Sequence, residues 1–462
     1  MYRLRRSARP PKPPALAADP PFRGPAVQTA RLDNGLELIV IERHELPIVT
    51  AALVARAGSA SDPQGKEGLA ALTAAAMKRG AGGRSALALE EGFADLGVEL
   101  KSEAQRERAT LVISALPSNV APALALLASV AREPGFPEAE VVRERSRLAD
   151  AIAQDEQDPA QIASRLRDVL AFGRQHPFGH PVQGYRSTVA ALTRDDVVAF
   201  HRAHWAPRGS ALVMVGDVTL DQAKAQADKA FGTWSGDSAA RPTWPAAVAP
   251  YPGKVAIVDR PDAAQTYVVQ VLSAPGRRGE DYYAWRLANE VLGSGAWGRL
   301  YKNLRQDKGY AYGANGMVVL GAGPLGWGAA APVQTDKTKE SVAEVAKELK
   351  DILNGRPATD DELSKAKDNQ TLTLAGQWET ANAVAGSLMD IVRYGLAEDY
   401  YATFPTKVRA LNVGNVSSAA KVIHPDKLIW VIVGDRAKIE AGIRELNLGE
   451  LKYLDADGKP IS

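Results

Sequence analysis

The sequence predicts an α+β fold of two homologous domains, each with a mainly antiparallel sheet and helices packed on one face. Three observations support this prediction. Two landmarks recur at one spacing, each half runs from strands through helices to a final strand, and a segment without periodicity separates the halves. The 462 residues also exceed the roughly 250 to 300 at which a single core stops growing. At least two domains are therefore expected.

The duplication is visible in two independent landmarks. Ile41 and Val258 occupy equivalent places in two strand pairs and are 217 positions apart; the pairs are 36–43 with 47–56, and 254–260 with 266–272. Asp217 and Asp435 each follow a Val-rich run that ends in Gly, and they are 218 positions apart. Two landmarks at nearly the same spacing indicate a repeated unit of about one domain.

The remaining elements follow from local patterns. We expect helices at 138–153 and 336–353, with capping boxes at Thr193/Asp196 and Thr359/Glu362 and a weaker one at Thr335/Thr338. The segment 232–253 is rich in Pro, Ala, Ser and Trp and has no helical or strand period, which is typical of a linker. The predicted organisation is a disordered arm at 1–25, a first domain at 26–231, a linker at 232–253 and a second domain at 254–462.

Composition excludes several function classes. The 56 basic and 54 acidic side chains nearly balance, so no charge excess points to nucleic acid. The chain contains no cysteine, which removes disulfides, thiolate nucleophiles and cysteine-based metal sites. No apolar run reaches the ~18 to 20 residues of a transmembrane helix. The Pro-rich start suits an exported protein whose signal peptide is removed upstream, so a periplasmic location is favoured over a cytoplasmic one, although both stay open.

Several motifs together resemble the pitrilysin or insulinase family of inverted zinc peptidases. They are Leu-Asp-Asn-Gly-Leu at 32–36, Gly-Leu-Ala at 68–70, His-Pro-Phe-Gly-His-Pro at 176–181 and, most specifically, Gly-Arg-Leu-Tyr-Lys-Asn-Leu-Arg at 298–305 with Gly-Tyr-Ala-Tyr at 309–312. The resemblance spans nearly the whole chain. It implies a clamshell of two α+β domains and a link to peptide hydrolysis.

The main departure from the family is the loss of its zinc motif. Family enzymes carry H-x-x-E-H on a helix, where the two His bind zinc and the Glu activates water. Aligned on Gly-Leu-Ala at 68–70, those positions are Ala71, Ala74 and Ala75, and the third ligand falls near Ala151 or Ile152. Methyl groups bind no cation, and no H-x-x-E-H occurs anywhere in the chain. We therefore expect no metal in this chain.

The six histidines offer no obvious replacement site. His176 and His180 are four positions apart, but the intervening prolines and glycine prevent a helix, so both are interpreted as loop residues. His201 and His204 should lie near a helix end without a third ligand. His44 and His424 are interpreted as surface or strand-edge residues.

The resemblance assigns a role to Arg305 and Tyr312. A helix at 299–307 ended by Gly309 and a strand at 311–320 would place the two residues on either side of one turn. In the resembling enzymes such a pair reaches the zinc-bearing domain and hydrogen-bonds the substrate oxyanion. The alternative is structural: an arginine bound to carbonyls or a carboxylate, and a tyrosine half-buried in a strand.

A glycine-rich segment precedes this pair. Gly293, Gly295 and Gly298 match G-x-G-x-x-G, but they follow a helix and not a strand, so a dinucleotide site is excluded. In related non-catalytic subunits a segment here contacts substrate. The sequence leaves two interpretations open, a flexible substrate loop and a plain helix-to-helix turn.

Together these features predict a non-catalytic, substrate-binding subunit of a heterodimeric zinc endopeptidase. Its partner would be a homologous subunit that carries H-x-x-E-H and zinc, and its substrate an unfolded peptide. Two alternatives remain: a catalytically dead scaffold or core subunit of a larger complex, and a homodimeric peptide-binding module.

Overall fold

The computed structural model describes residues 22, 24–240, 245, 254–274, 277, 279, 281–319, 321, 325–424 and 427–461. Most of the predicted arm (1–21 and 23) and of the predicted linker (241–244 and 246–253) lies outside these residues. Within the described ranges, no helix combines the length and apolar character needed to cross a bilayer.

Each half of the chain contributes one six-stranded sheet. The first sheet has the order β1-β2-β8-β3-β7-β6, and the second has the order β11-β12-β10-β13-β9-β14. The strands of the first are β1 Gln28–Arg31, β2 Glu37–Glu42, β3 Val49–Ala55, β6 Lys101–Ala104, β7 Ala109–Ala115 and β8 Ser210–Gly216. Those of the second are β9 Val255–Asp259, β10 Gln265–Ala274, β11 Asn315–Val319, β12 Leu325–Gln334, β13 Ile429–Gly434 and β14 Leu451–Tyr453. The small hairpin of β4 (Gly80–Ala81) and β5 (Arg84–Ser85) stands apart.

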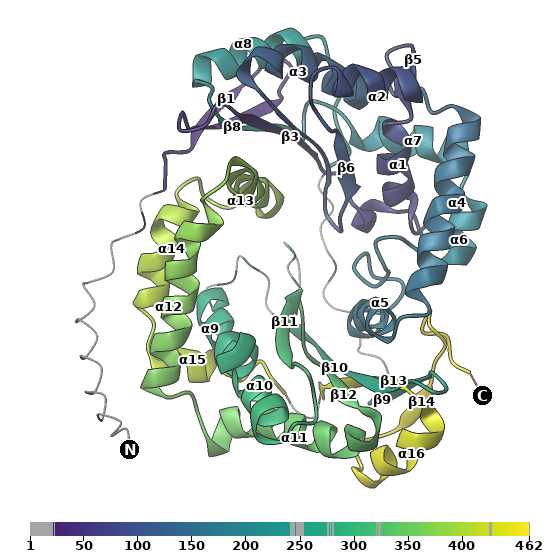
Figure 1. Ribbon diagram of the computed structural model, residues 1–462, viewed down its shortest axis with the longest axis vertical. Coiled ribbons are helices and arrows are strands. Elements are labelled where there is room, and N and C mark those ends of the chain that lie inside the picture. The colour runs from purple at the N-terminus through teal and green to yellow at the C-terminus, as the bar shows by residue number, and fades with distance from the viewer. Residues whose placement is uncertain are drawn as a thin grey trace, which may run out of the picture.

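The helices surround these two sheets (Figure 1). The first half carries α1 Leu69–Met77, α2 Ala86–Ala94, α3 Pro117–Arg132, α4 Glu138–Asp155, α5 Pro159–Phe172, α6 Arg186–Ala191, α7 Arg194–His204 and α8 Leu220–Phe231. The second half carries α9 Tyr282–Gly293, α10 Arg299–Tyr301, α11 Thr338–Lys350, α12 Asp360–Gln377, α13 Ala381–Tyr394, α14 Tyr400–Arg409, α15 Val413–Ala420 and α16 Arg436–Glu445.

Strand register confirms the predicted duplication. Ile41 of β2 faces Val215 in the parallel pair β2–β8, and Val258 of β9 faces Val433 in the parallel pair β9–β13. β8 and β13 then pair antiparallel with β3 and β10, which continue antiparallel to β7 and β12. The two halves therefore share one topology, which differs at the edge, where β1 is antiparallel to β2 but β14 is parallel to β9.

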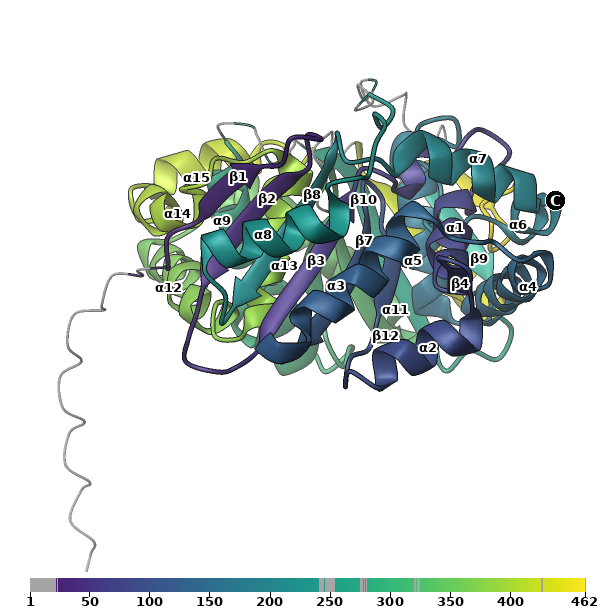
Figure 2. The same ribbon diagram turned by 90° about the horizontal axis from the view of Figure 1, so that it is seen from above.

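Both faces of each sheet are apolar. In β2, Leu38 and Val40 pack into the core under the first half's own helices, while Ile39 and Ile41 join the core that contains α13. Figure 2 shows α3 and α8 lying across the outer face of the first sheet. A strand buried on both faces needs apolar residues at every position, which explains the run Leu-Ile-Val-Ile at 38–41.

The two halves exchange one helix each. α13 of the second half packs on β3 and β8 of the first sheet, and α5 of the first half packs on β10 and β13 of the second sheet (Figure 1). Ion pairs reinforce this crossing: Asp390 of α13 pairs with Arg108 of the first half at 3.5 Å, and Arg393 of α13 pairs with Glu107 of the first half at 3.0 Å. The inner face of each sheet is thus covered by the other half.

Most predicted helix boundaries agree with the structure. Capping boxes at Thr193 and Thr359 are confirmed. The one at Thr335 is wrong, because residues 335–337 form a 3₁₀ turn in which the Thr338 hydroxyl donates to the Thr335 carbonyl at 2.8 Å. The helix expected at 336–353 is accordingly a 3₁₀ turn, then α11, then a π-helical end at 351–355.

Candidate functional site

The helix at the zinc-motif positions is α1, and its start is fixed by a carboxylate. Asp62 accepts hydrogen bonds from the backbone N–H of Gly68 and of Ala70, both at 2.8 Å. Gly68 has φ +101°, and a Cβ there would lie 2.5 Å from the Gln183 carbonyl oxygen, so only glycine fits. Burial raises the pKa of Asp62 well above its usual value, while the backbone donors oppose this shift. The start of α1 is therefore fixed by Asp62 and Gly68, although the helix contains no H-x-x-E-H.

No zinc ligand occupies the motif positions. Ala74 is buried, whereas Ala71 and Ala75 are half-buried. α1 packs against α4, so the structure does bring the motif positions near the expected third-ligand region, where Ala151 is half-buried and Ile152 is fully buried. Among the residues that the structure describes, no group of three or more His, Asp or Glu could hold a metal. The residues present do not fit zinc.

The one buried acidic side chain of α4 is already paired. Glu144 accepts from Arg79 at 2.8 Å, just past the end of α1, and from Arg147 at 2.7 Å. A carboxylate shared by two guanidinium groups is held by charge-assisted hydrogen bonds and stabilises the contact between α1 and α4. Glu144 thus acts as a structural link between these helices.

The histidines have structural partners. The loop interpretation of His176 and His180 is confirmed, because both lie between α5 and α6. Burial lowers the pKa of His176, His180 and His201, which favours their neutral forms. Their ring nitrogens contact backbone carbonyls: His176 Nε2 lies 3.2 Å from the Pro245 oxygen, His180 Nδ1 lies 3.0 Å from the Pro181 oxygen, and His201 Nε2 lies 2.9 Å from the Ala131 oxygen.

Arg305 and Tyr312 converge, as predicted from their spacing. The Arg305 guanidinium carbon lies 4.8 Å from the centre of the Tyr312 ring. Tyr312 is 77% exposed and Arg305 is exposed as well. Within the described part of the chain, Arg305 has no carboxylate partner. Neither structural alternative therefore describes this pair, since the arginine is not paired and the tyrosine is not half-buried.

The base beneath this pair is rigid. Leu304 and Ala311, which precede the two exposed residues, are buried. Asn303 is buried too, and its amide donates to Glu344 and to Glu348, both at 2.9 Å. Each exposed side chain is thus attached to a backbone whose neighbouring residue is buried in the core.

The local elements differ from prediction in two details. The helix that begins with α10 ends as a π-helix at 302–307, where the Lys308 N–H donates to the Asn303 carbonyl. The strand expected at 311–320 begins only at Asn315, and Ala311 forms a single bridge to Val333. Gly309 adopts φ +67°, so the chain turns sharply and delays the strand; Leu320 lies outside the described residues.

The glycine-rich segment is a turn between α9 and α10. Gly293 is the last residue of α9, and a Cβ there would lie 1.9 Å from the Gly316 nitrogen, so this glycine allows a helix and a strand to touch. Gly295, with φ +52°, starts a short 3₁₀ turn in open space, and Gly298 precedes α10. The helix-to-helix turn is what the structure has; contact with substrate stays a prediction.

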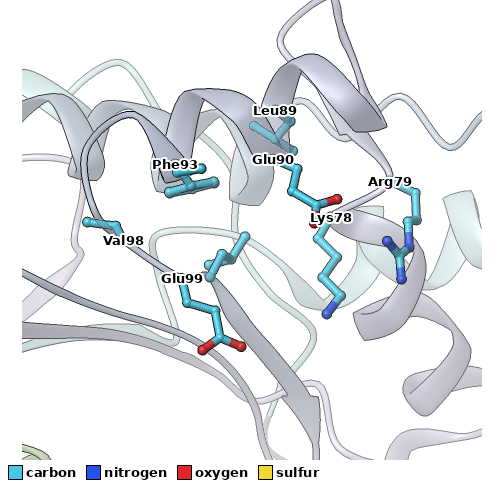
Figure 3. A pocket seen from close by; sticks show the side chains of 9 residues that line it. Lys78, Arg79, Leu89, Glu90, Phe93, Val98 and Glu99 are labelled. Atoms are coloured by element: carbon cyan, nitrogen blue, oxygen red, sulfur yellow. The ribbon is translucent and has the colours of Figure 1, made fainter.

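A pocket of about 320 Å³ was not anticipated from the sequence. It lies between α2, the end of α1 and the residues that lead into β6. Figure 3 shows Leu89 and Phe93 side by side on α2, with Lys78, Glu90 and Glu99 around them. The spacing of Leu89 and Phe93, one helical turn apart, is a signal of an apolar helix face, but it does not distinguish a pocket wall from a packed core.

Comparisons with known proteins agree with this architecture. A family model described as "Insulinase (Peptidase family M16)" matches residues 38–182, and one described as "Peptidase M16 inactive domain" matches residues 191–370. The crystal structure of a peptidase M16 inactive domain from Pseudomonas fluorescens is 25% identical, has a TM-score of 0.82, and matches over 88% of this chain and 97% of that chain. A protease from Helicobacter pylori, 19% identical over 88% of this chain and 99% of that chain with a TM-score of 0.79, shares the fold.

Two relatives found by sequence similarity match over a smaller share of the chain. An uncharacterized zinc protease of Mycobacterium leprae is 27% identical over 50% of this chain and 52% of its own length. Another, from Streptomyces coelicolor, is 25% identical over 62% of this chain and 63% of its own length. The matched region thus spans about half to two thirds of these relatives.

The duplicated fold and these matches define a protein with two M16-type domains. The chain belongs to the insulinase family, peptidase family M16. Its sequence contains no H-x-x-E-H.

Proposed function

We propose that this chain is a non-catalytic, substrate-binding subunit of a zinc endopeptidase. It would contribute Arg305 and Tyr312 to an active site whose zinc and H-x-x-E-H motif belong to a homologous partner subunit. The substrate class is unfolded peptide.

One observation carries the proposal: the chain contains no H-x-x-E-H but presents two exposed hydrogen-bond donors, with the Arg305 guanidinium over the Tyr312 ring, on a buried base. An exposed aromatic ring and an unpaired guanidinium add nothing to the core. Their arrangement is explained if both donors are directed to a ligand outside this chain.

The chemistry follows from the two donors. Attack on a peptide carbonyl places negative charge on its oxygen, and the partner's zinc would activate the attacking water. The Arg305 guanidinium and the Tyr312 hydroxyl would donate hydrogen bonds to that oxygen. Such bonds strengthen as charge develops, so each donor is worth about 2.7 to 4 kcal/mol in the transition state.

The test requires the assembled complex. The chain is co-expressed with an H-x-x-E-H homologue from the same source, and zinc content and cleavage of an unfolded peptide are measured. We expect activity only in the complex, and a fall in kcat of about 10²- to 10³-fold for Arg305→Ala and for Tyr312→Phe. Gln306→Ala, at the exposed position next to Arg305, is the matched control and should keep full activity.

The alternatives predict different results. A scaffold subunit would form a stable complex whose function tolerates both substitutions, and a homodimeric peptide-binding module would assemble and bind peptide without any partner. Zinc-dependent cleavage by the chain alone would contradict the proposal.

A further inference from the structure

A second pocket lies between the two halves, away from Arg305 and Tyr312. Its volume is about 440 Å³, and its walls come from β1, β2 and the end of β3 in the first half and from the end of α13 in the second. Ile39 and Ile391 supply buried apolar surface from either side, and half-buried Leu396 adds to it. Pockets of this size hold small ligands or one or two residues of a peptide.

Arg56, at the end of β3, lines this pocket with an unsatisfied donor. Its Nε is buried and has no hydrogen-bond partner, and no ion pair to Arg56 is found in the described ranges. Leaving a buried donor of a charged group without a hydrogen-bond partner is destabilising. A fold that retains this cost at a pocket wall indicates a group that is satisfied by a ligand.

The carboxylates of the pocket do not serve Arg56. Glu37 pairs with Arg31 at 2.8 Å, and Glu398 accepts from the Thr29 hydroxyl at 3.1 Å. Among the charged groups of the lining, Arg56 and Glu398 have no ion pair in the described ranges, and Glu398 is occupied by the Thr29 hydroxyl, so Arg56 is the basic group open to an added carboxylate. A guanidinium binds a carboxylate with charge-assisted, often bidentate hydrogen bonds.

We propose that this pocket binds a carboxylate carried on an apolar side chain, as in the C-terminal residue of a peptide that ends in leucine. Arg56 holds the carboxylate, and the isoleucine walls take the side chain. This site does not depend on the proposed role of Arg305 and Tyr312, because it belongs to the chain alone.

The experiment is a fluorescence-anisotropy titration of the full chain without a partner. The probe is an N-terminally fluorescein-labelled tetrapeptide that ends in leucine, as the free acid and as the C-terminal amide. We expect the free acid to bind at least about tenfold more tightly than the amide, and Arg56→Gln to abolish that preference. Equal binding of acid and amide, no binding of either, or an unchanged preference in Arg56→Gln would overturn the proposal.

Two controls separate binding from folding. Arg208→Gln removes an equally charged side chain that is 67% exposed and paired with Asp237 outside the pocket, and it should leave the preference unchanged. Arg56→Lys keeps the charge and should retain part of the preference, at an unchanged melting temperature. N-acetyl-leucine as a competitor distinguishes the source: displacement as effective as by unlabelled peptide identifies small acids as ligands of the same site, and weak displacement identifies peptide ends.

Discussion

At the scale of single residues, two carboxylates raise the pKa of His44 in the turn after β2. His44 lies between β2 and β3, with Nδ1 2.7 Å from Asp217 Oδ1 and Nε2 3.5 Å from Glu42 Oε2. The hydrogen bond with Asp217 is the main reason that the pKa of His44 is raised above 6.5. Both carboxylates follow or end strands of the first sheet, so the protonated ring ties the ends of β2 and β8 together.

This arrangement predicts a pH-dependent stability. A raised folded-state pKa means that the protonated ring stabilises the fold, fully below about pH 6.5, and that this contribution is lost as pH rises through the folded pKa. His44→Gln should therefore lower the melting temperature slightly at pH 5.5 and not at pH 9. Thermal unfolding of both proteins across this range checks it; a difference independent of pH would contradict the assignment.

Sequence reasoning anticipated the candidate site residues only in part. The convergence of Arg305 and Tyr312 followed from a helix, a turn and a strand at known spacing. The exposure of Tyr312 did not, because a residue in a strand is ordinarily half-buried and the positive φ of Gly309 postpones the strand to Asn315. Arg56 gave no signal at all, since nothing local distinguishes an unpaired arginine from a solvated one.

At the scale of elements, α13 is one of the two exchanged helices that link the halves. Leu388 of α13 is fully buried in the core that also contains Ile39 and Val213 of the first sheet. Asn382, near the start of α13, accepts hydrogen bonds from the hydroxyls of Thr50 at 2.9 Å and Ser114 at 3.1 Å. The helix is therefore held by both apolar and polar contacts to strands that belong to the other half.

Truncating this helix should weaken the whole chain. Leu388→Ala removes a fully buried side chain and leaves a cavity, so we expect a loss of about 2 to 5 kcal/mol in the free energy of unfolding. Leu372→Ala on α12 is the matched control, because Leu372 is 44% exposed, and it should change stability by less than about 0.5 kcal/mol. Urea denaturation followed by circular dichroism measures both, and equal effects would show that α13 does not link the halves.

The sequence predicted the strands better than the helix that covers their second face. Runs such as Leu-Ile-Val-Ile at 38–41 indicate a strand buried on both faces, and the repeat spacing placed their counterparts. What covers the second face is decided by a helix about 340 positions away in the chain. No local pattern specifies that helix, because an amphipathic face fits many apolar surfaces.

At the scale of the whole molecule, the exchange of α5 and α13 makes each half dependent on the other. Removing either half would expose the inner face of the remaining sheet, including Ile41 and Val215 in the first or Val258 and Val433 in the second. Contiguous apolar surface of this kind is rarely tolerated in a soluble monomer. The two domains therefore share their stability despite their separate sheets.

This dependence predicts one unfolding transition. Scanning calorimetry of the full chain should give a single peak whose calorimetric and van't Hoff enthalpies agree, and the fragment 26–231 alone should be aggregation-prone. Two resolved peaks, or a fragment that stays monomeric and folded, would show that the helix exchange contributes little.

The late position of α13 in the sequence also affects how the first half folds during translation. The last strand of the first sheet ends at Gly216, but the helix that covers its inner face begins at Ala381. At roughly 5 to 20 residues per second, the nascent first half waits on the order of 10 to 30 seconds with an uncovered apolar surface. During translation the inner face of the first sheet is thus exposed to self-association for longer than in a protein whose domains close one after the other.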